Sequence, residues 1–491
     1  MCSMAETGEQ LHVAFFPFMT PGHSIPMLDL VRLFVARGVK TTVFTTPLNA
    51  PDISKYLNIR ASTNNNDLAT SVYITPFPSI KAGLPEGVES QDRTTSPEMS
   101  LKFFLAMELL KHPLEQFLKD TKPNCLIADN FFPYATDVAK MFDIPRVVFQ
   151  STGCFSMCVM MALSQHQPQN SVASDNDFFI IPNLPHEIKL TKSQLQPDHK
   201  GSDDEMNASL SRLFGGVGRA LFTSYGIIFN SFTRLESEYV DYFNNVVRKP
   251  SRVWHLGPVS LCNRQVEGKS IRGKSSSINE NICLKWLNDR KPNSVIYVSF
   301  GSLTCFSASQ LREIAIALEC FGRDFIWVLR GGENVEEWLP KGFEERVKSK
   351  GLIIRGWAPQ VLILDHEVIG GFVTHCGWNS ILESISAGVP MVTWPVYAEQ
   401  FYNEKLVADV LKVGVKVGSM HWSDTSSGTF LEHEKIGDAL KEVMDGEGML
   451  EMRERAKKLK EMAYEAVEEG GSSYCQLSSL IDQLSSSKNG I

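Results

Sequence analysis

Between Trp357 and Gln400 the chain runs through two strand-to-helix junctions in series. An apolar run at 370–375 ends in a polar tip, and residues 378–385 then show the apolar spacing of a helix. Gly388 ends that helix, and a second buried-strand run follows at 389–394. Alternating buried strands and helices predict an open α/β sheet, and such sheets bind ligands at the carboxyl ends of their strands.

The helix expected to begin at Trp378 follows a glycine, so its first turn presents free backbone N–H groups and the positive end of the helix dipole. This arrangement is typical of an anion site, most often for phosphate. His375, Asn379 and Ser380 add side-chain donors to it. Three further side chains near by could bind hydroxyl groups: Glu383, Glu399 and Gln400. Phosphate together with a polyol indicates a nucleotide sugar.

The stretch from Trp357 to Gln400 resembles, nearly residue for residue, the signature box of plant UDP-dependent glycosyltransferases. The similarity continues on both sides, from about Leu11 to the C-terminal helix. The resemblance implies an α/β fold of two doubly wound, Rossmann-like parallel-sheet domains that face each other across a cleft, the GT-B type. It also implies a UDP-sugar as co-substrate, with no cofactor and no metal.

The resemblance assigns nucleotide contacts within this stretch. Trp357 would stack on uracil, Gln360 would bond the ribose, and Glu383 would take the ribose hydroxyls. Three residues would hold the diphosphate: His375, Asn379 and Ser380. Taken singly, these residues have other readings. Ser380-x-x-Glu383 is also a helix capping box, Trp357 could belong to the core, and His375 could be a satisfied buried histidine.

The resemblance also assigns contacts at the sugar end, where Trp378, Glu399 and Gln400 would read the sugar hydroxyls. In the family, glutamine at the last position of the box goes with glucose and histidine with galactose, so Gln400 indicates UDP-glucose. Glucuronate and xylose donors remain open. Four more residues complete the expected donor site: Gly301, Ser302, Ala358 and Tyr397. Gly301 and Ser302 follow a strand, where they would supply further diphosphate contacts.

Transfer of the sugar requires a base, and the sequence offers a candidate in the first half of the chain. Histidine has the pKa suited to proton abstraction at neutral pH, and a carboxylate commonly orients it. His23 is expected at the exit of a turn between a strand at 11–18 and a helix at 25–35, and Asp129 at the end of another strand. Both contexts resemble the catalytic dyad of the family. The alternative is that His23 caps a helix and Asp129 makes an isolated turn.

The chain has 491 residues, too many for one hydrophobic core, so two domains are expected. We expect an acceptor-binding domain over 1–257, a polar linker over 258–280, and a UDP-sugar-binding domain over 281–469. We call the linker the connector. The closing helix, at about 470–491, is expected to pack back onto the first domain.

Two short patterns point elsewhere. Residues 268–275 match the P-loop formula, but they lie in the connector, without the buried strand that a P-loop follows. Asp175 and Asp177 have the spacing used by metal-dependent glycosyltransferases, but they lie in a polar loop in the half expected to bind acceptor. The chain contains no Gly-x-Gly-x-x-Gly, which disfavours an NAD-type oxidoreductase.

A formal net charge of −8 does not favour binding to nucleic acid or to anionic membranes. The ten cysteines form no C-x-x-C pair and indicate reduced thiols. The N-terminal residues lack the pattern of a signal peptide, and no apolar run reaches the roughly 20 residues of a membrane span. We expect a cytoplasmic monomer whose partners are the donor and a small hydrophobic acceptor.

The sequence thus predicts an inverting, metal-independent hexosyltransferase acting on a hydroxyl or carboxyl of a hydrophobic plant secondary metabolite. A triterpenoid or steroid aglycone or glycoside is favoured; the alternatives are a flavonoid, isoflavonoid or other phenolic acceptor, or an inactive sugar-nucleotide-binding protein. The intact His23 and Asp129 argue against the inactive protein. Four apolar side chains could line an acceptor pocket or belong to the core: Phe131, Phe132, Phe155 and Met157.

Overall fold

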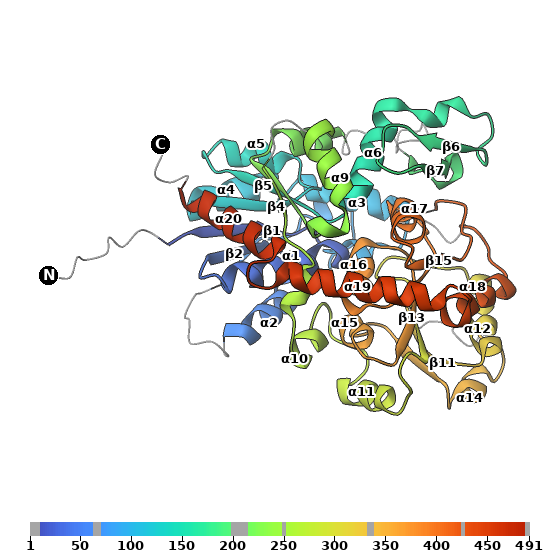
Figure 1. Ribbon diagram of the computed structural model, residues 1–491. Helices are drawn as coiled ribbons and strands as arrows, with labels where there is room; N and C mark the ends of the chain where they lie inside the picture. Colours follow the sequence, from blue (N-terminus) through green and yellow to red (C-terminus); the bar gives the residue numbers. More distant parts are fainter. Residues whose placement is uncertain are drawn as a thin grey trace.

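The computed structural model describes residues 10–61, 70–197, 215–247, 252–330, 338–423 and 428–486. Two sheets dominate it (Figure 1): seven strands in the order β3-β2-β1-β4-β5-β8-β9, and six in the order β12-β11-β10-β13-β14-β15. Every strand pairing in both sheets is parallel. The predicted pair of doubly wound parallel-sheet domains is confirmed.

The first domain contains the seven-stranded sheet. Its strands are β1 (His12–Phe16), β2 (Lys40–Thr45), β3 (Ser71–Ile74), β4 (Cys125–Asp129), β5 (Arg146–Gln150), β8 (Gly226–Phe229) and β9 (Val253–His255). Its helices are α1 (Pro21–Val35), α2 (Ala50–Ala61), α3 (Pro97–Glu108), α4 (Lys111–Thr121), α5 (Tyr134–Lys140), α6 (Cys154–His166) and α9 (Ser237–Tyr242). Because helices cover both faces, the central strands are near-continuous apolar runs that are buried throughout.

The second domain contains the six-stranded sheet. Its strands are β10 (Val295–Ser299), β11 (Asp324–Leu329), β12 (Gly351–Arg355), β13 (Ile369–Thr374), β14 (Met391–Thr393) and β15 (Gly414–Lys416). Its helices are α11 (Glu280–Asn288), α12 (Ala308–Phe321), α14 (Phe343–Val347), α15 (Gln360–Leu364), α16 (Trp378–Ala387), α17 (Gln400–Lys405), α18 (His433–Asp445) and α19 (Met449–Val467). The short helix α10 (Val266–Ser270) lies in the connector.

The last helix, α20 (Ser472–Ser486), returns to the first domain after α19 has run along the second (Figure 1). Leu477, Leu480 and Leu484, spaced on one helical face, are buried in the core of the first sheet. Ser473 Oγ donates a hydrogen bond of 2.6 Å to the carbonyl of Gly257, just beyond β9. The end of the chain therefore stabilises the domain that the chain began.

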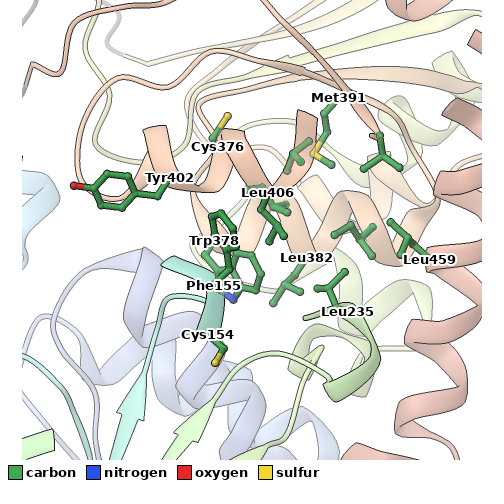
Figure 2. Close-up of a cluster of buried hydrophobic side chains, with 14 of the residues drawn as sticks. Cys154, Phe155, Leu235, Cys376, Trp378, Leu382, Met391, Tyr402, Leu406 and Leu459 are labelled. Atoms are coloured by element: carbon green, nitrogen blue, oxygen red, sulfur yellow. The ribbon is translucent and has the colours of Figure 1, made fainter. Parts of the chain in front are cut away.

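An apolar cluster joins the two domains (Figure 2). Cys154 and Phe155 of α6 lie in it beside Trp378 and Leu382 of α16. Phe155 and Met157 are buried in this cluster, and Phe132 is buried in another core cluster, so the core reading holds for these three side chains. A polar contact accompanies the packing, because Ser156 Oγ donates to Asn403 Oδ1 at 2.6 Å across the domain boundary.

Two local predictions differ from the structure. Helix α1 begins at Pro21 rather than at residue 25, because proline suits the first helical position and the carbonyl of Thr20 accepts from the N–H groups of His23 and Ser24 at 3.0 and 2.9 Å. The polar loop expected around Asp175 and Asp177 leads directly into an antiparallel hairpin of β6 (Phe178–Ile181) and β7 (Ile188–Thr191). In β6, exposed and buried side chains alternate, which gives the hairpin one face toward the core.

Candidate active site

In both sheets, the expected functional residues lie at or just after the carboxyl ends of adjacent strands. In the first sheet β1, β4 and β5 are neighbours, and they lead into His23, Asp129 and Ser151. In the second sheet β10, β13 and β14 are neighbours in the same way, and the donor box follows β13 and β14. Because parallel strands end at one edge, residues far apart in sequence are brought together there.

His23 and Asp129 form a direct pair. His23 Nδ1 lies 2.8 Å from Asp129 Oδ2, and the two side chains are 18% and 0% exposed. The other carboxylate oxygen, Oδ1, accepts the backbone N–H of Phe131 at 3.0 Å. Since a carboxylate only accepts, the proton of the neutral imidazole lies on Nδ1, and the ring's lone pair lies on Nε2. Thr20 is the N-cap residue of α1, so His23 is not a helix cap.

The surroundings of Nε2 include a residue that the sequence analysis missed. Ser151 Oγ lies 3.3 Å from His23 Nε2. The one sequence feature that could have indicated Ser151 is its position as a polar residue directly after β5, the neighbour of β4 in the sheet. Phe18 and Phe131 pack around the imidazole, each with a ring centroid 5.2 Å from it. The imidazole of His23 is therefore partly exposed and is flanked by an aromatic wall.

Across from this pair, His375 is enclosed by glycine backbone. A Cβ built on Gly301 would come within 2.5 Å of His375 Nε2, and one on Gly377 within 2.4 Å, so side chains are excluded at both positions. Burial lowers the pKa of His375 to about 4. The ring is therefore neutral at physiological pH and can donate one N–H, but it adds no positive charge.

Helix α16 begins at Trp378 with Gly377 as its N-cap residue, and no side chain caps it. Ser380 is the third residue of the helix, so the capping-box alternative for Ser380 and Glu383 is wrong. The first-turn N–H groups, from Trp378 to Ser380, have no acceptor within the helix and lie at the positive end of the dipole. They adjoin His375 at the edge of the sheet, where an anionic group would find several donors.

The expected ribose residues form one hydrogen-bonded group. Gln360 Nε2 donates to Glu383 Oε2 at 2.8 Å and to Ser380 Oγ at 3.0 Å. Glu383 Oε1 accepts a further bond of 2.5 Å from Arg272 Nη1. Arg272 belongs to the connector, and the sequence analysis missed it because nothing local distinguishes it from other polar residues of that segment.

The backbone of Trp357 is hydrogen-bonded to the connector. The backbone N–H of Trp357 donates to Ser277 Oγ at 2.9 Å, and its carbonyl accepts from the N–H of Ser277 at 2.8 Å. The indole is partly buried, between the strand β12 and the helix α15. Ala358 follows directly and is buried, and its carbonyl accepts from the N–H of Gln360 at 2.9 Å.

At the expected sugar end, two side chains are already engaged. The indole N–H of Trp378 donates to the carbonyl of Asn230 in the first domain at 2.7 Å, so this group is not available to a sugar hydroxyl. Gln400 Oε1 accepts from the backbone N–H groups of Val396 and Tyr397 at 2.9 and 3.1 Å, which leaves its amide N–H groups as the donors. The amide orientation of Gln400 is thereby fixed.

Glu399 lies between these groups and the first domain. Burial raises the pKa of Glu399. Its carboxylate accepts from Asn403 Nδ2 at 3.3 Å.

A hydrogen bond ties the two halves of the site together. Pro26 lies inside α1 and has no N–H, so the carbonyl of Gly22 four residues earlier lacks its helical donor. Asn379 Nδ2 donates to this carbonyl at 2.5 Å. The N-terminus of α16 is therefore in contact with the turn of α1 that carries His23.

The two short patterns set aside above have other surroundings. The P-loop match begins inside α10 (Val266–Ser270), and a 3-10 turn at Val259–Cys262 precedes this helix rather than a strand. Asp177 Oδ2 accepts from the N–H of Ser174 in the turn before β6. Among the residues that the structure describes, no three His, Cys, Asp or Glu side chains group as metal ligands. Among the same residues, no helix is both long and apolar enough to cross a membrane.

Comparison with known proteins agrees with this geometry. Residues 279–456 match the family model described as UDP-glucoronosyl and UDP-glucosyl transferase. UDP-glucosyl transferase 73M2 of Saponaria officinalis is 72% identical over 487 residues, 99% of each chain. Scopoletin glucosyltransferase of Nicotiana tabacum is 49% identical over 478 residues, 97% of this chain and 98% of that protein.

Solved structures agree as well. The crystal structure of Glycyrrhiza uralensis UGT73P12, complexed with glycyrrhetinic acid 3-O-monoglucuronide, matches with a TM-score of 0.90 at 36% identity. The match covers 98% of this chain and 96% of that one. Fold, site geometry and full-length similarity thus lead to one conclusion: the chain belongs to the plant UDP-glycosyltransferases, enzymes of the GT-B fold.

Proposed function

We propose that this enzyme transfers glucose from UDP-glucose to a hydroxyl or carboxyl of a hydrophobic plant secondary metabolite, with inversion and without a metal ion. The observation that carries the proposal is the His23–Asp129 pair, because His23 lies on the turn of α1 whose Gly22 carbonyl accepts a hydrogen bond from Asn379 of the donor box. Base and donor box thus come from different domains and adjoin.

His23 acts as the general base. Nε2 takes the proton of the acceptor hydroxyl while the acceptor oxygen bonds to the anomeric carbon, and the bond from that carbon to the phosphate oxygen breaks. The Asp129 carboxylate, 2.8 Å from Nδ1, stabilises the imidazolium that forms. One displacement inverts the anomeric centre, so an α-linked donor gives a β-glycoside.

UDP leaves with the electron pair of the broken bond, and its charge must be stabilised. The first-turn N–H groups of α16, the N–H of the neutral His375 and the turn at Gly301 and Ser302 are the donors that we assign to the diphosphate. The amide of Gln400 and the carboxylate of Glu399 would bind the glucose hydroxyls, with Tyr397 beside them. These donors are the reason to expect activity without a divalent cation.

We assign the acceptor to the aromatic wall of the first domain. The Phe18 and Phe131 rings adjoin His23, and Phe104 continues the wall with ring centroids 5.9 Å from each of them. Such a wall suits a flat or fused-ring aglycone. We favour a triterpenoid or steroid, in keeping with the relative crystallised with glycyrrhetinic acid 3-O-monoglucuronide. The flavonoid alternative draws on UDP-glucose flavonoid 3-O-glucosyltransferase 7 of Fragaria ananassa, 48% identical. We place the reaction in the cytoplasm and in a single chain.

An acceptor panel tests the proposal. The enzyme is incubated with UDP-glucose, UDP-galactose or UDP-glucuronate and with triterpenoid, steroid, flavonoid and coumarin acceptors, with and without EDTA, and products are identified by mass spectrometry. We expect a hexoside from UDP-glucose, equal rates with EDTA, and the highest kcat/KM with a fused-ring acceptor. Tight UDP binding without UDP release on any acceptor would instead support the inactive binding protein.

A further inference from the structure

The connector, expected as a plain polar linker, is bound to both domains by three of its four basic residues. Lys269 pairs with Asp365 of the second domain, and Lys274 pairs with Asp92 of the first. Between them Arg272 reaches both domains at once. These are the basic residues of the segment whose P-loop resemblance the fold does not use.

The guanidinium of Arg272 bridges two buried carboxylates. Its Nε donates to Asp29 Oδ2 on α1 at 2.8 Å, and its Nη1 donates to Glu383 Oε1 on α16 at 2.5 Å. The Arg272 side chain is 7% exposed, and those of Asp29 and Glu383 are 0% and 5% exposed. Burial acts to lower the pKa of Arg272, but the two carboxylates outweigh it and raise that pKa overall, so the side chain is charged.

Both ends of this bridge are held by other contacts. Asp29 Oδ1 accepts from Asn263 Nδ2 at 2.8 Å and from the hydroxyl of Tyr56. Glu383 Oε2 accepts from Gln360 Nε2. The planar guanidinium therefore fixes the Glu383 carboxylate relative to an anchored point on the helix that carries His23.

The backbone beside Arg272 is equally constrained. Gly273 has a φ of +91°, and a Cβ on it would come within 2.4 Å of Trp357 Cζ2 and 2.9 Å of Ile25 Cδ1. The connector thus threads between α1 and the tryptophan expected to stack on uracil. The neighbour of Arg272 therefore cannot carry a side chain, because the chain at this position lies directly against Trp357 and Ile25.

The Glu383 carboxylate has hydrogen-bond-acceptor positions that Arg272 and Gln360 do not occupy. A carboxylate offers about four lone-pair positions. Arg272 and Gln360 occupy one on each oxygen. About two remain, which equals the number of free hydroxyl groups, 2′ and 3′, on the ribose of UDP.

We propose that Arg272 is a positioning residue for the donor, which holds the Glu383 carboxylate in the orientation that accepts both ribose hydroxyls of the UDP-sugar. The inference rests on the proposed function, in which Glu383 binds ribose. It adds a connector residue to the donor site, tied through Asp29 to the helix of the catalytic base.

The test compares UDP with 2′-deoxy-UDP by isothermal titration calorimetry, in the wild type, Arg272→Lys and Asp29→Asn. Arg272→Lys retains the charge but lacks the planar fork, so Glu383 loses its fixed orientation. We expect UDP affinity to fall about tenfold and 2′-deoxy-UDP affinity less than threefold, so that the preference for ribose largely disappears. Asp29→Asn leaves Arg272 bound to Glu383 but unanchored, and we expect the same loss to a smaller degree.

Steady-state kinetics separates positioning from a general structural effect. We expect KM for UDP-glucose to rise about tenfold in Arg272→Lys, with KM for the acceptor unchanged. Lys269→Gln is the matched control, since it removes a connector ion pair that does not reach Glu383, and it should keep the wild-type ribose preference. If Arg272→Lys does not fold, the ratio of UDP to 2′-deoxy-UDP affinity in Asp29→Asn tests the inference instead.

The outcomes distinguish the inference from the function on which it rests. A wild-type ratio of UDP to 2′-deoxy-UDP affinity in folded Arg272→Lys, or in Asp29→Asn where it must decide, overturns the inference alone. A wild-type enzyme that does not bind UDP, or that binds both nucleotides equally, overturns the donor-site assignment itself.

Discussion

Replacing Asp129 by asparagine removes the charge that faces His23 and changes almost nothing in the size of the side chain. Asp129 is wholly buried, and its Oδ2 lies 2.8 Å from His23 Nδ1. The amide can still fill the space and accept a hydrogen bond. The variant therefore isolates the electrostatic part of the pair from its packing.

The geometry sets the expected magnitude. With the two charges about 4 Å apart and an effective dielectric constant of about 20, the carboxylate stabilises the imidazolium formed in the transition state by about 4 kcal/mol. Each 1.36 kcal/mol or so corresponds to a tenfold change in rate, so kcat should fall about 10³-fold. Because Asp129 does not touch the donor box, the Kd for UDP should change less than twofold.

The assay is UDP release at saturating UDP-glucose and acceptor, with UDP affinity measured by calorimetry on the same preparation. Thermal unfolding is recorded as well, because Arg146, whose pKa burial lowers to about 9, is stabilised in its charged form by Asp129. Asp137→Asn, an exposed aspartate on the neighbouring helix α5, is the control and should behave as wild type. A fall in kcat of less than tenfold in folded Asp129→Asn would refute the role assigned to the pair.

Three further substitutions test other parts of the structure. Gly301→Ala should lower UDP affinity about tenfold by calorimetry, because φ is +74° and the new Cβ would displace the His375 ring; unchanged affinity would contradict the assigned diphosphate site. Trp378→Phe should lower the free energy of unfolding in urea by about 1–3 kcal/mol, since the carbonyl of Asn230 loses its donor, while KM for UDP-glucose stays within twofold; a large rise in KM would restore the indole as a sugar contact. Burial lowers the pKa of His255 from its ordinary value of 6.5 to about 4. Between these two pH values the unfolded state binds a proton that the folded state does not. The free energy of unfolding is therefore unaffected by His255 above pH 6.5 and falls as the pH is lowered toward 4. His255→Phe, which keeps the ring stacked on Phe229, should therefore lose up to about 3 kcal/mol less between pH 7 and pH 4 in urea titrations, and an identical pH profile would contradict the burial argument.

The sequence was sufficient for the parts of the site that depend on local pattern. Buried parallel strands are apolar runs, so the polar residue at the end of such a run marks the edge of the sheet. Asp129 and His375 were found in this way, and the structure places both at the carboxyl ends of central strands. Helix α16 likewise begins at the residue predicted, because a glycine precedes a helical run.

Contacts between residues distant in sequence leave no such pattern. The indole N–H of Trp378 donates to the carbonyl of Asn230, 148 residues away, and no local pattern indicates this contact. Arg272 lies 111 residues from Glu383 in a segment that reads as a polar linker. Only the fold shows that this segment enters the site.

The contact between Gly22 and Asn379 combines a feature that the local sequence reveals with one that it does not. The sequence reveals that Pro26 cannot donate to the carbonyl of Gly22 if the helix includes both. It does not reveal which group replaces that donor. The structure supplies Asn379, from the other domain, at 2.5 Å.

The central claim is that the base and the donor site belong to different domains and act together at one point. His23→Ala tests it most directly, with the Kd for UDP and the rate of glucoside formation measured on one preparation. The account predicts an unchanged Kd, within twofold, and a rate at least 10²-fold below wild type. Glucoside formation at a rate near that of wild type, or loss of UDP binding together with transfer, would contradict it.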